Sequence, residues 1–316
     1  MTTPLSRRDL LLGAGALLTA GVMTPAPRLS ASAQTRSRIG FVDDNLENFH
    51  ANTFLALLRG PLLARGFTVA GCVGLQEAPS RAWATKNNVP YIADAAEMDR
   101  MVDAYMVMAP STPETHEALC QRVFPFGKPT YVDKTFAPDL ATARELFALA
   151  RQSKTPMQTS SVLRYTNVQD EVRRTPDDVV EHMTTWGNGG SFDEYAIHPL
   201  ELLISVMGPE VETVMRRGDG DRSQILLNFS GNRTGTVNVY TSSSTPFAAS
   251  VTTRKSTRYL AVDQGPMFKN SLSTTLDFFA SGQPSVPEAE SIVIMSILDA
   301  VSMPQSRGRF VPVARQ

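Results

Sequence analysis

The chain has 316 residues, of which 42% are hydrophobic and 19% charged, and this composition excludes a disordered or low-complexity protein. Its length fits one large domain or two of ordinary size. The 30 basic and 31 acidic residues leave a formal charge of −1, which argues against a nucleic-acid partner, and two cysteines with four scattered histidines show no metal-binding spacing.

The first 33 residues have the order of an export signal. Residues 6–11 read Ser-Arg-Arg-Asp-Leu-Leu, and the apolar run from Leu11 to Val22 is too short to span a bilayer. Residues 31–33, Ala-Ser-Ala, form a cleavage site. We interpret residues 1–33 as a twin-arginine signal peptide, with an ordinary Sec signal as the alternative. The mature protein is then periplasmic or secreted, has no stable membrane anchor, and meets the twin-arginine translocase during export.

Residues 34–158 alternate short apolar runs with helical periodicity. The strand candidates are residues 39–42, 67–73, 101–109, 129–132 and 157–161. Helix candidates follow through residues 49–58, 80–86, from 111 and over 140–152. Strands that alternate with helices imply βαβ crossovers, so we expect a doubly wound, Rossmann-like parallel sheet in an α/β fold.

The pattern changes in residues 159–316. Strand candidates cover residues 179–186, 212–216, 224–229, 234–240, 248–253 and 258–262, with Gly- and Asn-rich turns between neighbours. One helix candidate is inserted at 198–207, and two close the chain at 271–280 and 288–302. We therefore expect a C-terminal α+β domain with a mostly antiparallel sheet, and a ligand site at the domain junction, beyond the strand carboxyl ends.

Lys134 lies just past a strand candidate, with Asp133 beside it. A lysine in such a cleft can polarise a hydroxyl or a nicotinamide amide, or move a proton when burial lowers its pKa from about 10.4. The alternative is a surface lysine that pairs with Asp133. The strand-end position favours a catalytic role.

His198 stands at the mouth of a helix candidate. Glu194, His198 and Glu201 are spaced three and four residues apart, so they share one face if Ile197 is helical. Histidine can act as acid or base near its ordinary pKa of about 6.5. The alternative is a capping histidine bonded to a backbone carbonyl. Taken alone, this motif favours the capping histidine, so the assignment of His198 and Glu194 as catalytic depends on the motifs considered together.

Together these motifs resemble the glucose–fructose oxidoreductase / inositol dehydrogenase (Gfo/Idh/MocA) superfamily. Residues 133–135, Asp-Lys-Thr, are similar to its Glu-Lys-Pro motif, and residues 194–201 to its Asp-x-Gly-x-His-x-x-Asp motif. Residues 109–116 resemble its loop beneath the nicotinamide, and the Arg164-Tyr165 pair also fits. The resemblance runs from about Arg38 to the C-terminus.

The resemblance implies that Lys134 and His198 flank the substrate carbon, with His198 as proton acceptor and Lys134 orienting cofactor and substrate. It also implies a bound NAD or NADP. The residues assigned to the cofactor are Gly40, Val42, Asp43, Asp44, Ala109, Ser111, His116, Asp133 and Lys134. Those assigned to a carbohydrate-like substrate are Arg164, Tyr165, Glu201 and His50.

The first turn departs from the family's G-x-G-x-x-G pattern, in which glycine lets the backbone approach a pyrophosphate. Residues 40–50 read Gly-Phe-Val-Asp-Asp-Asn-Leu-Glu-Asn-Phe-His, so only Gly40 remains and three carboxylates stand where the phosphates would lie. The acidic residue expected after the second strand is replaced by residues 72–76, Cys-Val-Gly-Leu-Gln. His50, in this segment, projects into the cleft of Lys134, or is a partly exposed histidine or a cap partner for Asn48.

The expected function is that of an exported oxidoreductase acting on a sugar, cyclitol or related polyol with a tightly held nicotinamide cofactor. A non-redox descendant that uses the Lys134/His198 cleft on a carbohydrate without dinucleotide is the alternative. A structural or partner-binding envelope protein is a third reading. By analogy with the family, the strands of residues 224–253 would pair two copies into a homo-oligomer.

Overall fold

The computed structural model describes residues 37–314, so the predicted signal at residues 1–33 lies outside the described residues. The described residues belong to one compact unit. Within residues 37–314, no helix is both long and apolar enough to cross a membrane.

The first sheet has five parallel strands in the order β2-β1-β3-β4-β5. The strands are β1 (Ser37–Asp43), β2 (Phe67–Gly74), β3 (Ala104–Val107), β4 (Thr130–Asp133) and β5 (Met157–Ser160). The helices between them are α1 (Phe49–Arg59), α2 (Glu77–Asn87), α3 (Ala95–Asp99), α4 (His116–Val123) and α5 (Leu140–Gln152). The expected doubly wound sheet is confirmed.

Apolar clusters lie on both faces of this sheet. Phe41 belongs to the cluster with α1 and α2, while its neighbour Val42 belongs to the cluster with α4 and α5. Successive strand residues point to opposite faces, so a strand buried on both sides reads as a continuous apolar run. Local signals fix the helix starts: Asn48 caps α1 and Asp139 caps α5 through their side-chain oxygens.

The second sheet has seven strands in the order β11-β10-β6-β9-β8-β7-β12. They are β6 (Val180–Gly187), β7 (Val211–Asp219), β8 (Arg222–Phe229), β9 (Thr234–Tyr240), β10 (Ala248–Thr253), β11 (Thr257–Ala261) and β12 (Val311–Pro312). The sheet is mostly antiparallel, as expected, but β6 and β9 pair in parallel. Helix α6 (Asn167–Arg173) precedes β6 in the chain, and the helices α7 (Phe192–Tyr195) and α8 (Ile197–Met207) lie between β6 and β7.

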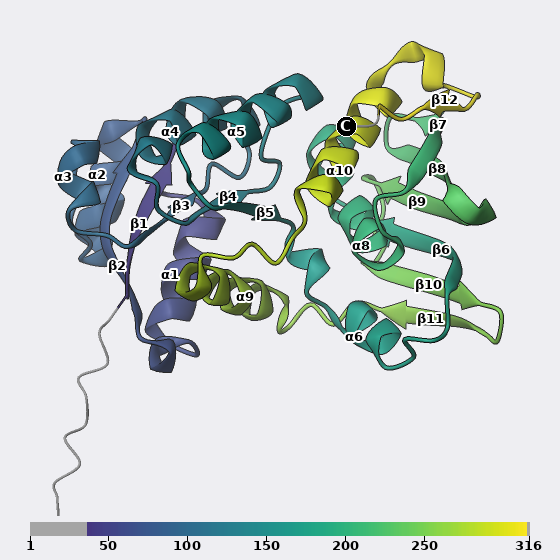
Figure 1. Cartoon of the computed structure of the whole chain (residues 1–316), viewed down its shortest axis with the longest axis horizontal. Coiled ribbons are helices and arrows are strands. Elements are labelled where there is room, and N and C mark those ends of the chain that lie inside the picture. Colours follow the sequence, from purple (N-terminus) through teal and green to yellow (C-terminus); the bar gives the residue numbers. More distant parts are fainter. Residues whose placement is uncertain (1–36, 315–316) are drawn as a thin grey trace, which may run out of the picture. The chain divides into compact units, whose positions relative to one another are not determined.

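The last two helices, α9 (Met267–Ser281) and α10 (Glu288–Ser302), connect the two sheets (Figure 1). Leu272 and Leu276 of α9 share an apolar cluster with Phe54 of α1. In α10, Met295 packs in the cluster beside α5 and Ile297 in the cluster of the second sheet. The C-terminal segment therefore completes the core of both halves and fixes the cleft between them.

Candidate active site

Side chains from six separate segments converge on one cavity of about 190 Å³. Lys134 follows the end of β4, Val162 and Leu163 follow the end of β5, His50 lies in the first turn of α1, and His198 in the first turn of α8. The remaining lining residues are Phe49, Tyr195, Phe247, Met267 and Phe268. The cavity thus lies where the carboxyl ends of the parallel strands face the second sheet, the usual ligand position in such folds.

Lys134 is almost fully buried, at 6% exposure. Its Nζ donates to the backbone carbonyl of Pro110 at 3.1 Å. A lysine ammonium carries three hydrogens, so two remain for a ligand in the cavity.

His198 is also buried, and its Nδ1 lies 2.7 Å from the hydroxyl of Ser161. Burial, together with the charges of Lys134 and His50, lowers the pKa of His198 to about 3, against the attraction of Asp133. The ring is therefore neutral at physiological pH. Its other nitrogen, Nε2, has no hydrogen bond to any residue in 37–314 and is left for the cavity.

His50 and Asp133 form a buried pair beside Lys134. The Nδ1 atom of His50 contacts a carboxylate oxygen of Asp133. The Tyr131 hydroxyl, which donates to the carbonyl of Ser160 at 2.9 Å, lies 3.3 Å from the other carboxylate oxygen. Burial alone would raise the pKa of Asp133, but the charge and hydrogen bond of His50, with Lys134, outweigh it and lower that pKa. Of the two readings of His50, the structure shows the one that projects into the cleft.

The cavity walls are aromatic. Phe49 and Phe268 meet edge to face with ring centroids 5.3 Å apart, and Phe268 also contacts the His50 ring. Phe247 lies against His198 with ring centroids 6.2 Å apart. Phe49 is 64% exposed, so it stands at the mouth of the cavity. Apolar walls around a few polar groups are typical of small-molecule sites.

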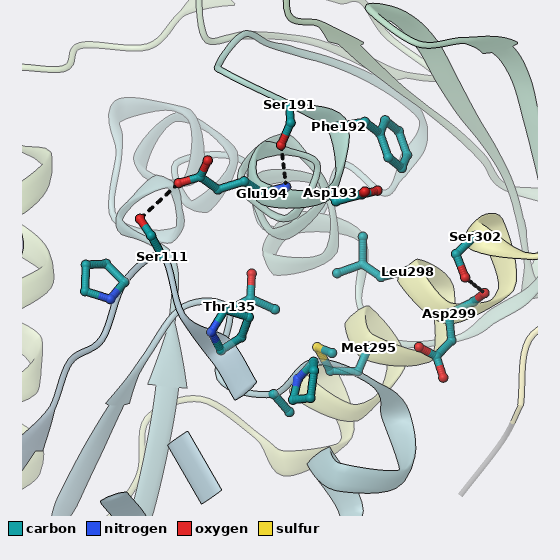
Figure 2. A pocket seen from close by; sticks show the side chains of 14 residues that line it. Ser111, Thr135, Ser191, Phe192, Asp193, Glu194, Met295, Leu298, Asp299 and Ser302 are labelled. Carbon is teal, nitrogen blue, oxygen red and sulfur yellow. Dashed lines mark hydrogen bonds between the residues drawn. The ribbon is translucent and has the colours of Figure 1, made fainter. Parts of the chain in front are cut away.

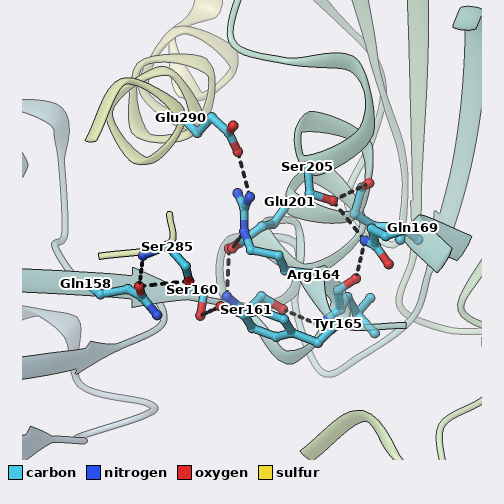
Figure 3. A network of polar contacts seen from close by, with 12 residues as sticks. Gln158, Ser160, Ser161, Arg164, Tyr165, Gln169, Glu201, Ser205, Ser285 and Glu290 are labelled. Atoms are coloured by element: carbon cyan, nitrogen blue, oxygen red, sulfur yellow. Dashed lines mark hydrogen bonds and ion pairs between the residues drawn. The ribbon is translucent and has the colours of Figure 1, made fainter. Parts of the chain in front are cut away.

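Arg164, Tyr165 and Glu201 do not line this cavity. Arg164 pairs with Glu201 at 2.8 Å and with Glu290 of α10 at 2.6 Å, and Tyr165 donates to the Ser160 hydroxyl at 3.1 Å (Figure 3). Burial raises the pKa of Glu201 despite the nearby Arg164. This network connects the end of β5 to α8 and α10, so the predicted direct contact of these three residues with a ligand in this cavity is not what the structure shows.

Glu194 and Ser111 line a second, larger cavity of about 500 Å³ (Figure 2). The Ser111 hydroxyl donates a hydrogen bond to the Glu194 carboxylate at 3.1 Å. Asp193 and Asp299 also line it, together with apolar residues such as Met295 and hydroxyl groups. No lysine or histidine lines this cavity. Glu194 is therefore separated from the Lys134/His198 cavity, although the next residue along the chain lines that smaller cavity.

Side chains of the turn between β1 and α1 form hydrogen bonds with other groups of the same turn. Asp43 is buried, and its carboxylate accepts from the backbone N–H of Asn45 at 3.2 Å, from the side chain of Asn48 at 2.8 Å and from the N–H of Ala109 at 3.1 Å. Asn45 and Asn48 accept in turn from the N–H groups of residues 47 and 51. Burial raises the pKa of Asp43 to about 7, against the effect of these hydrogen bonds. The side chains of the turn thus occupy its own backbone donors.

This turn is also tied to the end of β2. The carbonyls of Asp43 and Asp44 accept from the N–H groups of Leu75 and Gln76 at 3.1 and 2.9 Å. The Asp44 carboxylate accepts from the Gln76 amide at 3.0 Å. The two loops that would enclose the adenosine ribose in the family's arrangement are therefore hydrogen-bonded to each other.

Other residues assigned to the cofactor have packing roles. Gly40 lies inside β1, where an added Cβ would come within 3.0 Å of the Tyr105 ring. Val42 is in the core, and Ala109, with a φ of 46°, directs its N–H to Asp43. His116 is buried against the carbonyl of residue 108, and burial lowers its pKa.

Sequence reasoning assigned no role to several cavity residues. Ser161, which does not line the cavity but contacts His198, also has no predicted role, although a serine at the end of a strand and the start of a helical turn is a recognisable capping position. Phe247, Met267 and Phe268 come from segments 80 or more residues beyond the strand β5, and no local pattern points to the cavity. Within residues 37–314, no group of three or more His, Cys, Asp or Glu could hold a metal ion.

Comparisons with known proteins agree with this architecture. Residues 45–160 match the model of an oxidoreductase family with an NAD-binding Rossmann fold. A myo-inositol dehydrogenase from Corynebacterium glutamicum superposes with a TM-score of 0.74 at 14% identity, covering 89% of this chain and 100% of that one. A probable dehydrogenase from Thermotoga maritima gives 0.74 at 16%, covering 87% and 98%.

GenD2 from gentamicin A biosynthesis, solved with NAD, gives a TM-score of 0.73 at 16% identity and covers 95% of this chain and 100% of that one. At such identities these likenesses establish the fold. No curated protein matches the chain. The family match over the first sheet, together with the two-sheet fold, supports the same assignment as the sequence motifs. By the family match over residues 45–160 and by its two-sheet fold, the chain is similar to the NAD(P)-dependent oxidoreductases of the Gfo/Idh/MocA type.

Proposed function

We propose that this protein is an exported oxidoreductase that acts on a small sugar, cyclitol or related polyol with a tightly held nicotinamide cofactor. The observation that carries the proposal is the convergence of Lys134 and His198 on one cavity, each buried and each with hydrogen-bonding capacity not used by the protein. A buried polar group normally has its partners within the protein, so unused capacity aimed at a cavity indicates a ligand.

The cavity favours a compact polyhydroxylated substrate. Its volume of about 190 Å³ is below the range of about 300–1,000 Å³ usual for ligand pockets, so a single ring is a better fit than an oligosaccharide. Lys134, His50 and His198 supply polar atoms for hydroxyl or carbonyl groups, while Phe247 and Phe268 offer apolar faces to ring carbons. Among the structural neighbours are two myo-inositol dehydrogenases and a UDP-N-acetylglucosamine 3-dehydrogenase.

The cofactor of the family fits one end of the site better than the other. Near Lys134, the loop at Pro110 and the cavity leave polar atoms available, and a nicotinamide bound there would accept or supply hydride. At the β1–α1 turn, where a pyrophosphate would need backbone donors, the N–H groups of residues 45, 47 and 51 are already bonded to the side chains of Asp43, Asn45 and Asn48. As it stands the turn does not fit a pyrophosphate, so binding requires these side chains to give up their bonds.

Export restricts the reactions that the proposed enzyme could catalyse. The space outside the cytoplasm has no free nicotinamide pool to recycle the cofactor, so it would have to stay bound and return to its starting state in each turnover. Transfer between two sugars, epimerisation and oxidation-assisted glycosidic cleavage all meet this condition. We also propose that two copies pair through the C-terminal sheet.

The hydrogen bonds within the β1–α1 turn favour a second candidate function. A chain that bound no dinucleotide would keep the Lys134/His198 cavity and use it to bind a carbohydrate or process it by acid–base elimination. The bonds of the Asp43 carboxylate to Asn48 and Ala109 support this candidate, because they replace the contacts of a phosphate.

Native mass spectrometry of protein exported through its own signal decides between the two. We expect a mass increment of one NAD(P) per chain, released on denaturation, and turnover in a screen of polyols, cyclitols and sugars. Protein without dinucleotide, which also fails to bind added NAD(H), would overturn the oxidoreductase proposal and favour the second candidate.

The export route has its own test. Replacing Arg7 and Arg8 together with lysine should leave the precursor in the cytoplasm, because the translocase recognises the guanidinium pair rather than charge alone. Fractionation followed by immunoblotting measures this. Normal delivery of the double variant would indicate the Sec route instead.

A further inference from the structure

Ser161 controls the surroundings of the His198 ring. It is fully buried at the end of β5, with its hydroxyl 2.7 Å from Nδ1 of His198. The same hydroxyl oxygen accepts the backbone N–H of Leu163 at 3.2 Å, as the cap of the short helical turn Val162–Arg164. This oxygen is therefore already an acceptor for one neighbour.

The hydrogen of the Ser161 hydroxyl has one available acceptor. No carbonyl or carboxylate in residues 37–314 accepts from it, and its only other hydrogen-bonding neighbour is His198 Nδ1. A serine hydroxyl has a single hydrogen, and its oxygen is engaged as an acceptor by Leu163. The arrangement that satisfies both groups has Ser161 donating to Nδ1.

A neutral imidazole that accepts at one nitrogen carries its hydrogen on the other. We propose that Ser161 is a positioning residue that holds His198 in the tautomer with hydrogen on Nε2, so that His198 presents a hydrogen-bond donor to an oxygen of the substrate. Burial among Lys134, His50 and Asp133 keeps the ring neutral and supports this assignment. The inference rests on the proposed function, because it concerns the substrate side of the same cavity.

This tautomer gives His198 and Lys134 different roles in the reaction. A neutral His198 has no proton to release without forming an imidazolate, and with hydrogen on Nε2 it has no lone pair facing the cavity. It therefore polarises a carbonyl or stabilises a developing alkoxide by donation. In the direction of carbonyl reduction, the proton then moves to the substrate oxygen from the Lys134 ammonium, whose Nζ keeps two hydrogens beyond its bond to Pro110 and is left as the amine. Oxidation is the reverse transfer, from the substrate hydroxyl to that amine. This differs from the proton-acceptor role that the family resemblance implied for His198.

Ser161 is held in place by a chain of hydrogen bonds. Its backbone N–H donates to Glu201 at 2.7 Å, and Glu201 is held by Arg164 at 2.8 Å (Figure 3). Glu201 and His198 lie one helical turn apart on α8. The ion pair therefore fixes Ser161 relative to the histidine that it serves, and gives a role to two residues that line no part of the cavity.

Nitrogen NMR of the full mature protein tests the tautomer without any substrate. Labelling histidine with ¹⁵N gives four residues, and loss of one set of signals in His198→Gln assigns the site. We expect Nδ1 of His198 to show the shift of an unprotonated nitrogen and Nε2 that of a protonated one, unchanged from about pH 5 to pH 8. In Ser161→Ala the ring should shift toward a mixture of tautomers. A protonated Nδ1 in the wild type would overturn the inference.

Kinetics provide the second measurement. Ser161→Ala should lower kcat about tenfold with little change in KM, the scale of one lost hydrogen bond, and Ser161→Thr should restore most of it. Thr166→Ala is the matched control, because Thr166 is also buried and caps the neighbouring helix α6 without touching His198. Full activity in Ser161→Ala would overturn the inference even if the enzyme is the proposed oxidoreductase. A wild type that is inactive on every polyol would count against the proposed function alone, since the NMR result decides the tautomer by itself.

Discussion

Two neighbouring regions of this molecule differ in how far their polar side chains are hydrogen-bonded within the protein. At the Lys134/His198 cavity, each side chain has a protein partner on one side and unused hydrogen-bonding atoms on the other. At the β1–α1 turn, Asp43, Asn45 and Asn48 take up the donors of their own backbone. Within residues 37–314, the cavity therefore offers polar atoms to a ligand, whereas the side chains of the turn are hydrogen-bonded to the turn itself.

The largest expected effect lies at the cavity. Lys134→Ala and His198→Ala should each reduce kcat a hundredfold or more, the range for groups that position or move a proton, while the fold is retained. Steady-state kinetics and circular dichroism measure the two properties. Lys269→Ala and His182→Ala, which change a lysine and a histidine outside the cavity, are the controls. Near-normal activity in both cavity variants would refute the site assignment.

The turn should respond in stability rather than in chemistry. Asp43→Ala removes the acceptor of three hydrogen bonds, so the free energy of unfolding should fall by about 1–3 kcal/mol. Denaturant titration measures it. An unchanged stability would mean that the turn does not depend on this carboxylate, and the contrast between the two regions would be lost.

The pH dependence of stability gives a sharper view of the same residue. The pKa of Asp43 is about 7 in the folded chain and near 4 in an unfolded one, so the folded state keeps this proton longer. The resulting stabilisation is complete below about pH 4 and is lost as the pH rises through about 7. Asp43→Asn cannot ionise, so its unfolding free energy should decline less than that of the wild type over this window. Parallel curves for the two proteins would contradict the assignment.

His50 belongs to both regions, because it lies on α1 and pairs with Asp133 beside Lys134. His50→Ala should lower kcat/KM roughly tenfold, since it leaves a buried carboxylate without its main partner. His50→Asn places an amide donor near the position of Nδ1 and should recover part of the activity. Equal activity of the alanine variant and the wild type would show that His50 only completes the wall.

The smallest effect is expected at Asp44, which is only partly buried and bonds to Gln76. Asp44→Gly removes one negative charge from the phosphate end and should strengthen NAD(H) binding by less than about tenfold, because solvent screens the charge. Nicotinamide fluorescence titration measures it, with Asp44→Asn separating charge from backbone freedom. Weaker binding by the glycine variant would show that the carboxylate helps to hold the cofactor.

The sequence by itself determined the order and type of most elements, but not the short elements α3, α6, α7 and β12. The helices at 140–152 and 288–302 and the strands at 234–240 and 248–253 have the predicted bounds, because caps and apolar periodicity are local signals. The motif around Lys134 located one side of the cleft for the same reason: a lysine directly after a buried strand is placed by that strand's end.

Tertiary structure alone decided which polar groups satisfy one another. Asp43 bonds to Ala109, His50 to Asp133 and Ser161 to His198, partners 66, 83 and 37 residues apart. The sequence shows that these side chains can donate or accept but not which partner they meet, because that depends on how strands and helices pack. Arg164 and Glu201 matched a substrate-binding motif, yet their opposite charges meet each other in the interior, where an unpaired charge would be strongly unfavourable.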